Sequence, residues 1–160
     1  MTKTTVGKRI FIGKVFMPSM MDEQKSFAAA NMEAENDEIL QKFLADNKLD
    51  NKRAIMYAFG AESFMYWYGV VTEKPVEVPK GLMKYELPEG EVVEEKENGA
   101  IASFNMPANF IVKGFFEKVV NEGIAVYENP GDSPKPYFVE ELDMDQSEII
   151  GTWYLDQDED

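Results

Sequence analysis

The segment YAFGAESFMYWY, residues 57–68, is the most informative part of the chain because six of its twelve residues are aromatic. Extended runs over about 52–59 and 63–72 meet at a tight turn, Gly60-Ala61-Glu62. Aromatic and β-branched residues are typical of strands, so the segment predicts a pair of β-strands. The pair carries more ring surface than a small core normally needs. Part of it is therefore a candidate surface for stacking a flat ligand.

The sequence around this strand pair predicts that the same order of secondary-structure elements occurs twice, once before and once after a connector. Ile39, Leu40, Phe43 and Leu44 repeat at helical spacing, and the connector 73–81 holds Pro75, Pro79 and Gly81. Before the connector we expect a strand at 9–16, a helix at about 33–47 and the aromatic strand pair. After it we expect strands at 82–87 and 91–96, an extended segment at 100–104, a helix from about 105 to 123, and strands at 124–127, 137–142 and 148–155.

This order predicts an α+β fold: two pseudo-symmetric strand–helix–strand–strand repeats with antiparallel sheets, helices on one side and a ligand groove at the seam. We expect a single domain over residues 1–160. Its first half spans about 8–72, the linker about 73–81, the second half about 82–156 and an acidic tail 157–160.

Composition limits the chemistry. The chain has 160 residues, no cysteine, no histidine and a formal charge of −14, from 30 acidic and 16 basic residues. Without histidine and cysteine, Ser-His-Asp and Cys-His catalysis and ordinary zinc sites are excluded, so we expect no metal and no cofactor. The charge argues against direct nucleic-acid contact and favours cationic partners, or serves solubility alone. With no signal peptide, membrane span or disulfide pattern, we expect a cytoplasmic protein.

Four short motifs resemble the GyrI-like family, also described as the effector-binding domain of bacterial transcription activators. They are Tyr68-Gly69-Val70-Val71, Val78-Pro79-Lys80-Gly81-Leu82, Leu87-Pro88-Glu89-Gly90-Glu91 and Phe138-Val139-Glu140-Glu141-Leu142. The family's Ile-Pro ending is absent from the last strand, Gly151–Leu155. The resemblance implies a free-standing member, since both halves of the fold use the whole chain. Such members include gyrase inhibitors and hydrolases that open the strained cyclopropane of DNA-alkylating natural products.

Glu140 is the leading candidate site residue. By resemblance it occupies the acidic pocket position of the family, and its strand is otherwise apolar. A carboxylate in such surroundings is costly unless paired, which indicates a cationic ligand or a raised pKa. The alternative is a glutamate at a strand edge that points into water. Since Glu140 and Glu141 face opposite sides of the strand, we expect one of them to be solvated.

Aromatic side chains supply the remaining candidates. Trp67, Trp153 and Tyr57 are candidates for stacking on a flat or cationic ligand, with ordinary core packing as the alternative. Tyr137 could donate its hydroxyl to a ligand carbonyl, although strand parity places it opposite Glu140 unless the strand is bent.

Three functions remain open. In the first, an enzyme binds a bulky aromatic compound and hydrolyses its cyclopropane ring, with Glu140 as general base and Tyr57 or Tyr137 stabilising the developing negative charge. In the second, the same pocket sequesters or senses a cationic aromatic drug without turnover. In the third, the acidic surface around 91–97 mimics DNA toward a protein partner such as gyrase.

Overall fold

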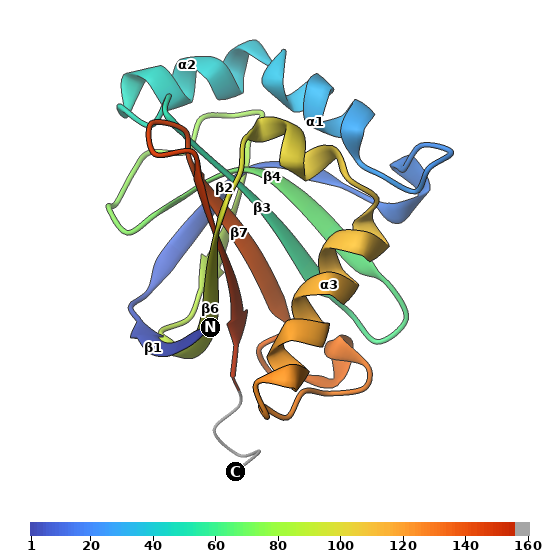
Figure 1. Cartoon of the computed structure of the whole chain (residues 1–160). Coiled ribbons are helices and arrows are strands. Elements are labelled where there is room, and N and C mark those ends of the chain that lie inside the picture. Colours follow the sequence, from blue (N-terminus) through green and yellow to red (C-terminus); the bar gives the residue numbers. More distant parts are fainter. Residues whose placement is uncertain (156–160) are drawn as a thin grey trace.

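The structure, a computed structural model, describes residues 1–155, so the acidic tail predicted at 157–160 lies outside the described residues. Its centre is one antiparallel sheet of eight strands in the order β1-β6-β8-β7-β3-β4-β2-β5 (Figure 1). The strands are β1 (Thr2–Val6), β2 (Arg9–Phe16), β3 (Lys52–Phe59), β4 (Phe64–Thr72), β5 (Met83–Leu87), β6 (Gly90–Asn98), β7 (Tyr137–Asp143) and β8 (Glu148–Tyr154). The helices are α1 (Ala28–Glu35), α2 (Glu38–Asp46) and α3 (Ala108–Asn121), with short 3₁₀ turns η1 (Pro18–Met20), η2 (Ile101–Asn105) and η3 (Pro130–Asp132).

The sheet has the predicted pseudo-symmetry. Strands β2, β3 and β4 of the first half correspond in order to β6, β7 and β8 of the second, and the halves join where β3 pairs with β7. The outermost strands are exchanged: β1 pairs with β6, and β5 pairs with β2. Two residues join β1 to β2, and two join β5 to β6. Such connections span at most about 10 Å, so the two ends of the sheet lie close together and the sheet curls into a half-barrel.

Side chains fill the inner face of this half-barrel. Arg9 on β2 reaches across it, donating to the Glu141 carboxylate of β7 at 2.8 Å and to the Tyr154 hydroxyl of β8 at 2.9 Å. The hydroxyls of Tyr85 and Tyr137 meet at 2.9 Å in the same way. These contacts join opposite walls, so the inner face is a second core with no helix over it.

All three helices cover the outer face. Their buried residues join one apolar cluster with the outward side chains of β3, β4, β7 and β8 (Figure 1). The helix contributions are Ala30 and Ala34 of α1, Leu40, Phe43 and Leu44 of α2, and Ala108, Phe115 and Val119 of α3. The α+β class and the placement of helices on one side are thereby confirmed. Across residues 1–155, no helix is long and apolar enough to cross a membrane.

Three element predictions were wrong. The helix expected over 33–47 is two helices, because Asp37 caps the second one by accepting the Leu40 amide at 2.9 Å. Residues 100–104 are largely the 3₁₀ turn η2 rather than extended chain. Residues 124–127 form no strand: β6, β7 and β8 already have neighbours on both sides, so this segment packs Ile124 and Val126 against the outer core instead.

A partly buried ion pair ties α1 to the sheet. Arg53 of β3 donates to the Glu35 carboxylate at 2.6 and 3.2 Å, and the Tyr68 hydroxyl donates to the same carboxylate at 2.8 Å. We expect Arg53→Met to lower the free energy of unfolding by roughly 2–3 kcal/mol, because Glu35 keeps its desolvation cost and loses its cation. Urea denaturation measures this. The control Lys42→Met breaks an exposed pair with Asp46 and should cost less than about 1 kcal/mol; equal losses would contradict the prediction.

A candidate ligand site beneath α3

A cleft of about 320 Å³ lies between α3 and the outer face of β6, β8 and β7. It begins at β7, the strand that joins the two halves, and runs across the second half to β6. Its lining is Glu95 and Glu97 from β6, Ile149 and Gly151 from β8, Glu140 from β7, Ser103 from η2, Met106, and Phe110, Ile111, Gly114, Phe115 and Lys118 from α3.

The floor of the cleft is a row of three residues set by strand register. Glu140 lies opposite Gly151 on β8, which in turn lies opposite Glu95 on β6. Gly151 has no side chain to fill the space between the two glutamates. A Cβ at this position would lie 3.1 Å from the ring of Phe115, so the glycine also lets α3 approach the sheet.

Glu140 is the deepest charged group of the cleft. It is only 8% exposed, and within residues 1–155 no side chain forms an ion pair or hydrogen bond with it. Burial raises the pKa of Glu140 to about 8; the negative charge of Glu97 adds to the increase and the Lys118 ammonium opposes it. An unpaired buried carboxylate is unfavourable for stability, which makes it a candidate functional group.

The mouth of the cleft is charged. Lys118, in the last turn of α3, places its ammonium 3.2 Å from Glu95 and 3.7 Å from Glu97. Three carboxylates therefore face one cation, and Glu140 is the carboxylate that the lysine leaves unpaired. The same three carboxylates do not form a group that could hold a metal ion.

Apolar groups line the rest. Phe115 closes the inner end, packed against Phe138 with ring centroids 4.6 Å apart. Phe110 and Met106 stand at the entrance and are 65% and 43% exposed. Large exposed apolar side chains beside a negatively charged cavity suit a ligand that is both aromatic and cationic.

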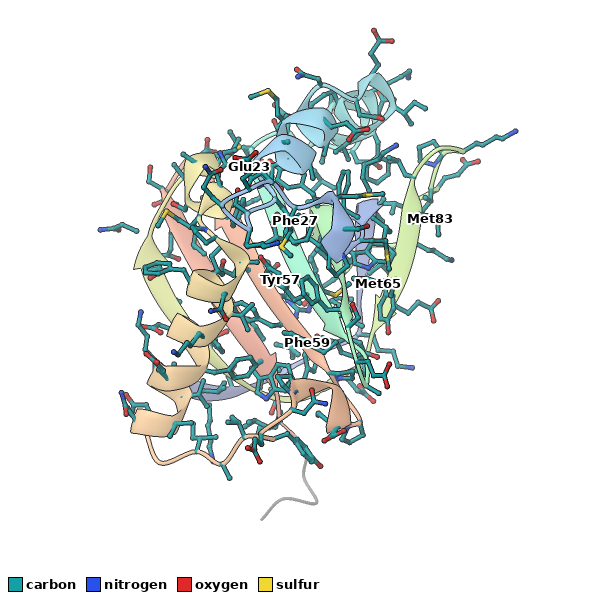
Figure 2. The ribbon with its side chains drawn as sticks, turned by 90° about the vertical axis from the view of Figure 1, so that its right-hand side faces the viewer. Glu23, Phe27, Tyr57, Phe59, Met65 and Met83 are labelled. Carbon is teal, nitrogen blue, oxygen red and sulfur yellow. The ribbon has the colours of Figure 1, made fainter. Side chains whose placement is uncertain are left out.

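Tyr57 and Trp153, two of the residues predicted from the sequence, share the outer face with Glu140. Both lie in the row of residues adjacent to the row that contains Glu140. In this adjacent row, Tyr57 lies opposite Phe138, and Phe138 lies opposite Trp153. Both are buried, Trp153 under Phe116 of α3 at 4.9 Å. Figure 2 shows Tyr57 between Phe27 and Phe59 in a column of aromatic rings beside α3. Burial is the main cause of the raised pKa of Tyr57, and the charge of Glu140 adds to it. Both aromatics therefore lie in the core beside the cleft and do not line it.

Trp67 and Tyr137 lie on the inner face. Trp67 packs edge-on against Phe11 and Tyr85, with centroids 5.8 and 5.6 Å away. Tyr137 lines a separate hollow of about 480 Å³ at the open side of the half-barrel. The structure therefore does not bring these two residues to the cleft that holds Glu140. Glu141 also faces inward, with Arg9 as its partner.

Gly114 offers a way to close the cleft without disturbing the fold. It lines the cleft from α3, and an added Cβ there meets no atom within 4 Å. We expect Gly114→Leu to lower ligand affinity at least roughly tenfold by filling the cavity, while Gly114→Ala leaves affinity within about twofold and stabilises the helix by roughly 0.5–1 kcal/mol. Isothermal titration calorimetry checks both variants. Unchanged affinity in Gly114→Leu would show that ligand binds elsewhere.

Comparison with known proteins gives the fold. No family model matches the chain, and no curated protein matches its sequence. Among solved structures, SAV2435 bound to tetraphenylphosphonium is similar, with a TM-score of 0.55 and 11% identity, over 95% of this chain and 90% of that one. An integron cassette protein from the mobile metagenome of Vibrio cholerae, VCH_CASS2, aligns with a TM-score of 0.46 and 12% identity, over 94% of this chain and 92% of that one. The likeness to SAV2435 agrees with the fold predicted from the sequence.

Proposed function

We propose that this chain is a GyrI-like domain that binds a bulky aromatic cation in the cleft beneath α3. The observation that carries the proposal is Glu140, a buried carboxylate that has no ion-pair or hydrogen-bond partner within residues 1–155 and that lines a cleft with aromatic groups at its side. A cationic ligand would supply the missing counter-charge, and Phe110 and Phe115 would contact its rings. A protein of similar fold, SAV2435, binds tetraphenylphosphonium, which belongs to this chemical class. The four sequence motifs and the absence of cysteine fit a cytoplasmic member of that family.

The test compares two ions of nearly the same shape and opposite charge. Tetraphenylphosphonium and tetraphenylborate are titrated separately into the protein and followed by calorimetry. We expect the phosphonium to bind with one site per chain and the borate to bind at least about 100-fold more weakly, because three carboxylates line the cleft. Comparable binding of the two ions would mean that hydrophobic contact alone drives association and would contradict the proposal.

Binding should also depend on pH. The ligand favours ionised Glu140, whose pKa is about 8 in the free protein, so below pH 8 binding must displace a proton. We expect affinity to rise roughly tenfold or more between pH 6 and pH 9. Glu95, Glu97 and Lys118 also face the cleft, and burial raises the pKa of Tyr57 and Tyr66 above this range. Glu140→Gln should remove most of the pH dependence; an equal dependence in that variant would assign it to another group.

The pKa of Glu140 also favours a second candidate, hydrolytic opening of a strained cyclopropane ring. A carboxylate with a pKa of about 8 is a stronger base than an ordinary glutamate, and above pH 8, where it is ionised, it can accept a proton from an attacking water. Ring opening would then transfer the water's hydroxyl to ring carbon, with the released electron pair taken up by a conjugated carbonyl. Substoichiometric protein with a cyclopropane-bearing alkylator, followed by mass spectrometry, tests this. Multiple turnovers that disappear in Glu140→Gln would support hydrolysis; binding without product would leave a drug-binding domain.

A further inference from the structure

The cleft contains two separate acidic positions. Glu140 lies on β7 and Glu95 on β6, two strands away in the same row. Neighbouring strands are about 4.8 Å apart, so the Cα atoms of the two glutamates are about 10 Å apart, with Gly151 and the Phe115 ring that packs on it between them. Glu97 faces outward beside Glu95 because it is two residues further along β6. Each of the two positions can therefore hold a cationic group of its own.

Lys118 already occupies the outer position. Its ammonium pairs with Glu95 and Glu97, while the inner position, Glu140, has no ion-pair partner in the described part of the chain. The lysine side chain is 52% exposed, and ion pairs this open to water are weak. Its flexible four-carbon stem lets the ammonium move away into solvent without disturbing α3. The Lys118 ammonium thus occupies the outer position, and a cationic group of a bound molecule can replace it there.

We propose that the ligand of this cleft is a dicationic aromatic molecule, with one cationic group at Glu140 and the second at Glu95 and Glu97 in place of the Lys118 ammonium. The inference rests on the proposed binding function and names its ligand class. Two cationic groups would balance the two acidic positions, and an aromatic spacer of about 7–10 Å would run between them along the Phe115 ring, which covers Gly151. With Lys118 released and the three carboxylates ionised, the cleft keeps two uncompensated negative charges when a monocation binds and one when a dication binds.

The test uses a matched pair of ligands. The dication is benzyltriphenylphosphonium with a para trimethylammoniomethyl group. The monocation is its neopentyl isostere, in which carbon replaces the quaternary nitrogen. In the wild-type protein at pH 8.5 we expect the dication to bind at least tenfold more tightly than the monocation. In Glu95→Gln/Glu97→Gln that preference should fall below threefold. The control Glu86→Gln/Glu94→Gln removes the same net charge outside the cleft and should keep the preference.

Lys118 provides the second arm of the test. Lys118→Gln should increase the preference for the dication at least threefold, because the outer carboxylates lose their internal cation. Lys113→Gln, which breaks an exposed pair with Glu117 on the same helix, should leave the preference unchanged. A dication no tighter than the monocation, or a preference that persists without Glu95 and Glu97, overturns the inference; the binding function still stands if both ligands need Glu140. Failure of both ligands to bind the wild-type protein overturns both proposals.

Discussion

Glu140→Gln is expected to weaken tetraphenylphosphonium binding at pH 9 by roughly 30-fold or more, which corresponds to about 2 kcal/mol. At this pH the wild-type carboxylate is mostly ionised, and because Glu140 is only 8% exposed, water screens its attraction to the ligand weakly. Glutamine keeps nearly the same shape and removes only the charge. The effect should be large because no side chain within residues 1–155 forms an ion pair with this buried group, so the ligand supplies its counter-charge.

Glu141→Gln is the matched control. It removes the same charge from the adjacent position on β7, but Glu141 faces inward and pairs with Arg9. Affinity should stay within about threefold of wild type, provided that measurements are made well below the unfolding temperature. A similar loss of affinity in both variants would indicate that the net charge of the protein, rather than the cleft, attracts the ligand.

The same substitution, Glu140→Gln, should stabilise the unliganded protein at alkaline pH. The pKa of Glu140 is about 8 in the folded state, against an ordinary glutamate value of 4.5 that applies to the unfolded chain. Between these values the folded protein holds a proton that the unfolded chain has released, so stability falls as pH rises from 4.5 to 8 and then levels off. A pKa that is three or more units higher in the folded state corresponds to roughly 4 kcal/mol of folding stability, which the wild type loses above pH 8. Glutamine has no proton to release, so the variant keeps this stability.

Thermal unfolding at two pH values tests this prediction. At pH 9 we expect the Tm of Glu140→Gln to exceed that of the wild type by about 8 °C or more, and at pH 5 by only a few degrees. Glu141→Gln should lower the Tm at both pH values, since Arg9 loses its carboxylate partner. A Tm difference between Glu140→Gln and wild type that is the same at pH 5 and pH 9 would show that Glu140 is not buried as an ionisable group.

Most strands could be predicted from the sequence because their apolar and aromatic residues form local patterns. The limits expected for the strands at 9–16 and 52–59 match β2 and β3. Strand β1 was not predicted, since Thr2–Val6 is mostly exposed and its pairing partner is more than 80 residues away in the chain. Local pattern carries no information about such a partner.

The site was predicted in part, for a related reason. Strand parity separates Glu140 from Glu141 and Tyr137, but it does not say which face a helix covers. Trp67 is buried because the sheet curls and its inner face becomes a core. The curling depends on the exchange of β1 and β5 between the two halves, and the local sequence around Trp67 does not indicate that exchange. The sequence did not identify Gly151, Gly114 and Lys118 as site residues. Each belongs to the site because of the residues that the fold places next to it, and these are distant in the chain. The i, i+2 spacing of Glu95 and Glu97 was an available signal that both side chains share one face.

The position of a bound ligand tests the central claim most directly. Tetraphenylarsonium has the shape and charge of tetraphenylphosphonium, and its arsenic atom gives an anomalous X-ray signal. In crystals of the complex, we predict one arsenic peak in the cleft between the Glu140 carboxylate and the rings of Phe110 and Phe115. A peak at the open side of the half-barrel, beside Tyr85 and Tyr137, with the cleft beneath α3 empty, would contradict the account.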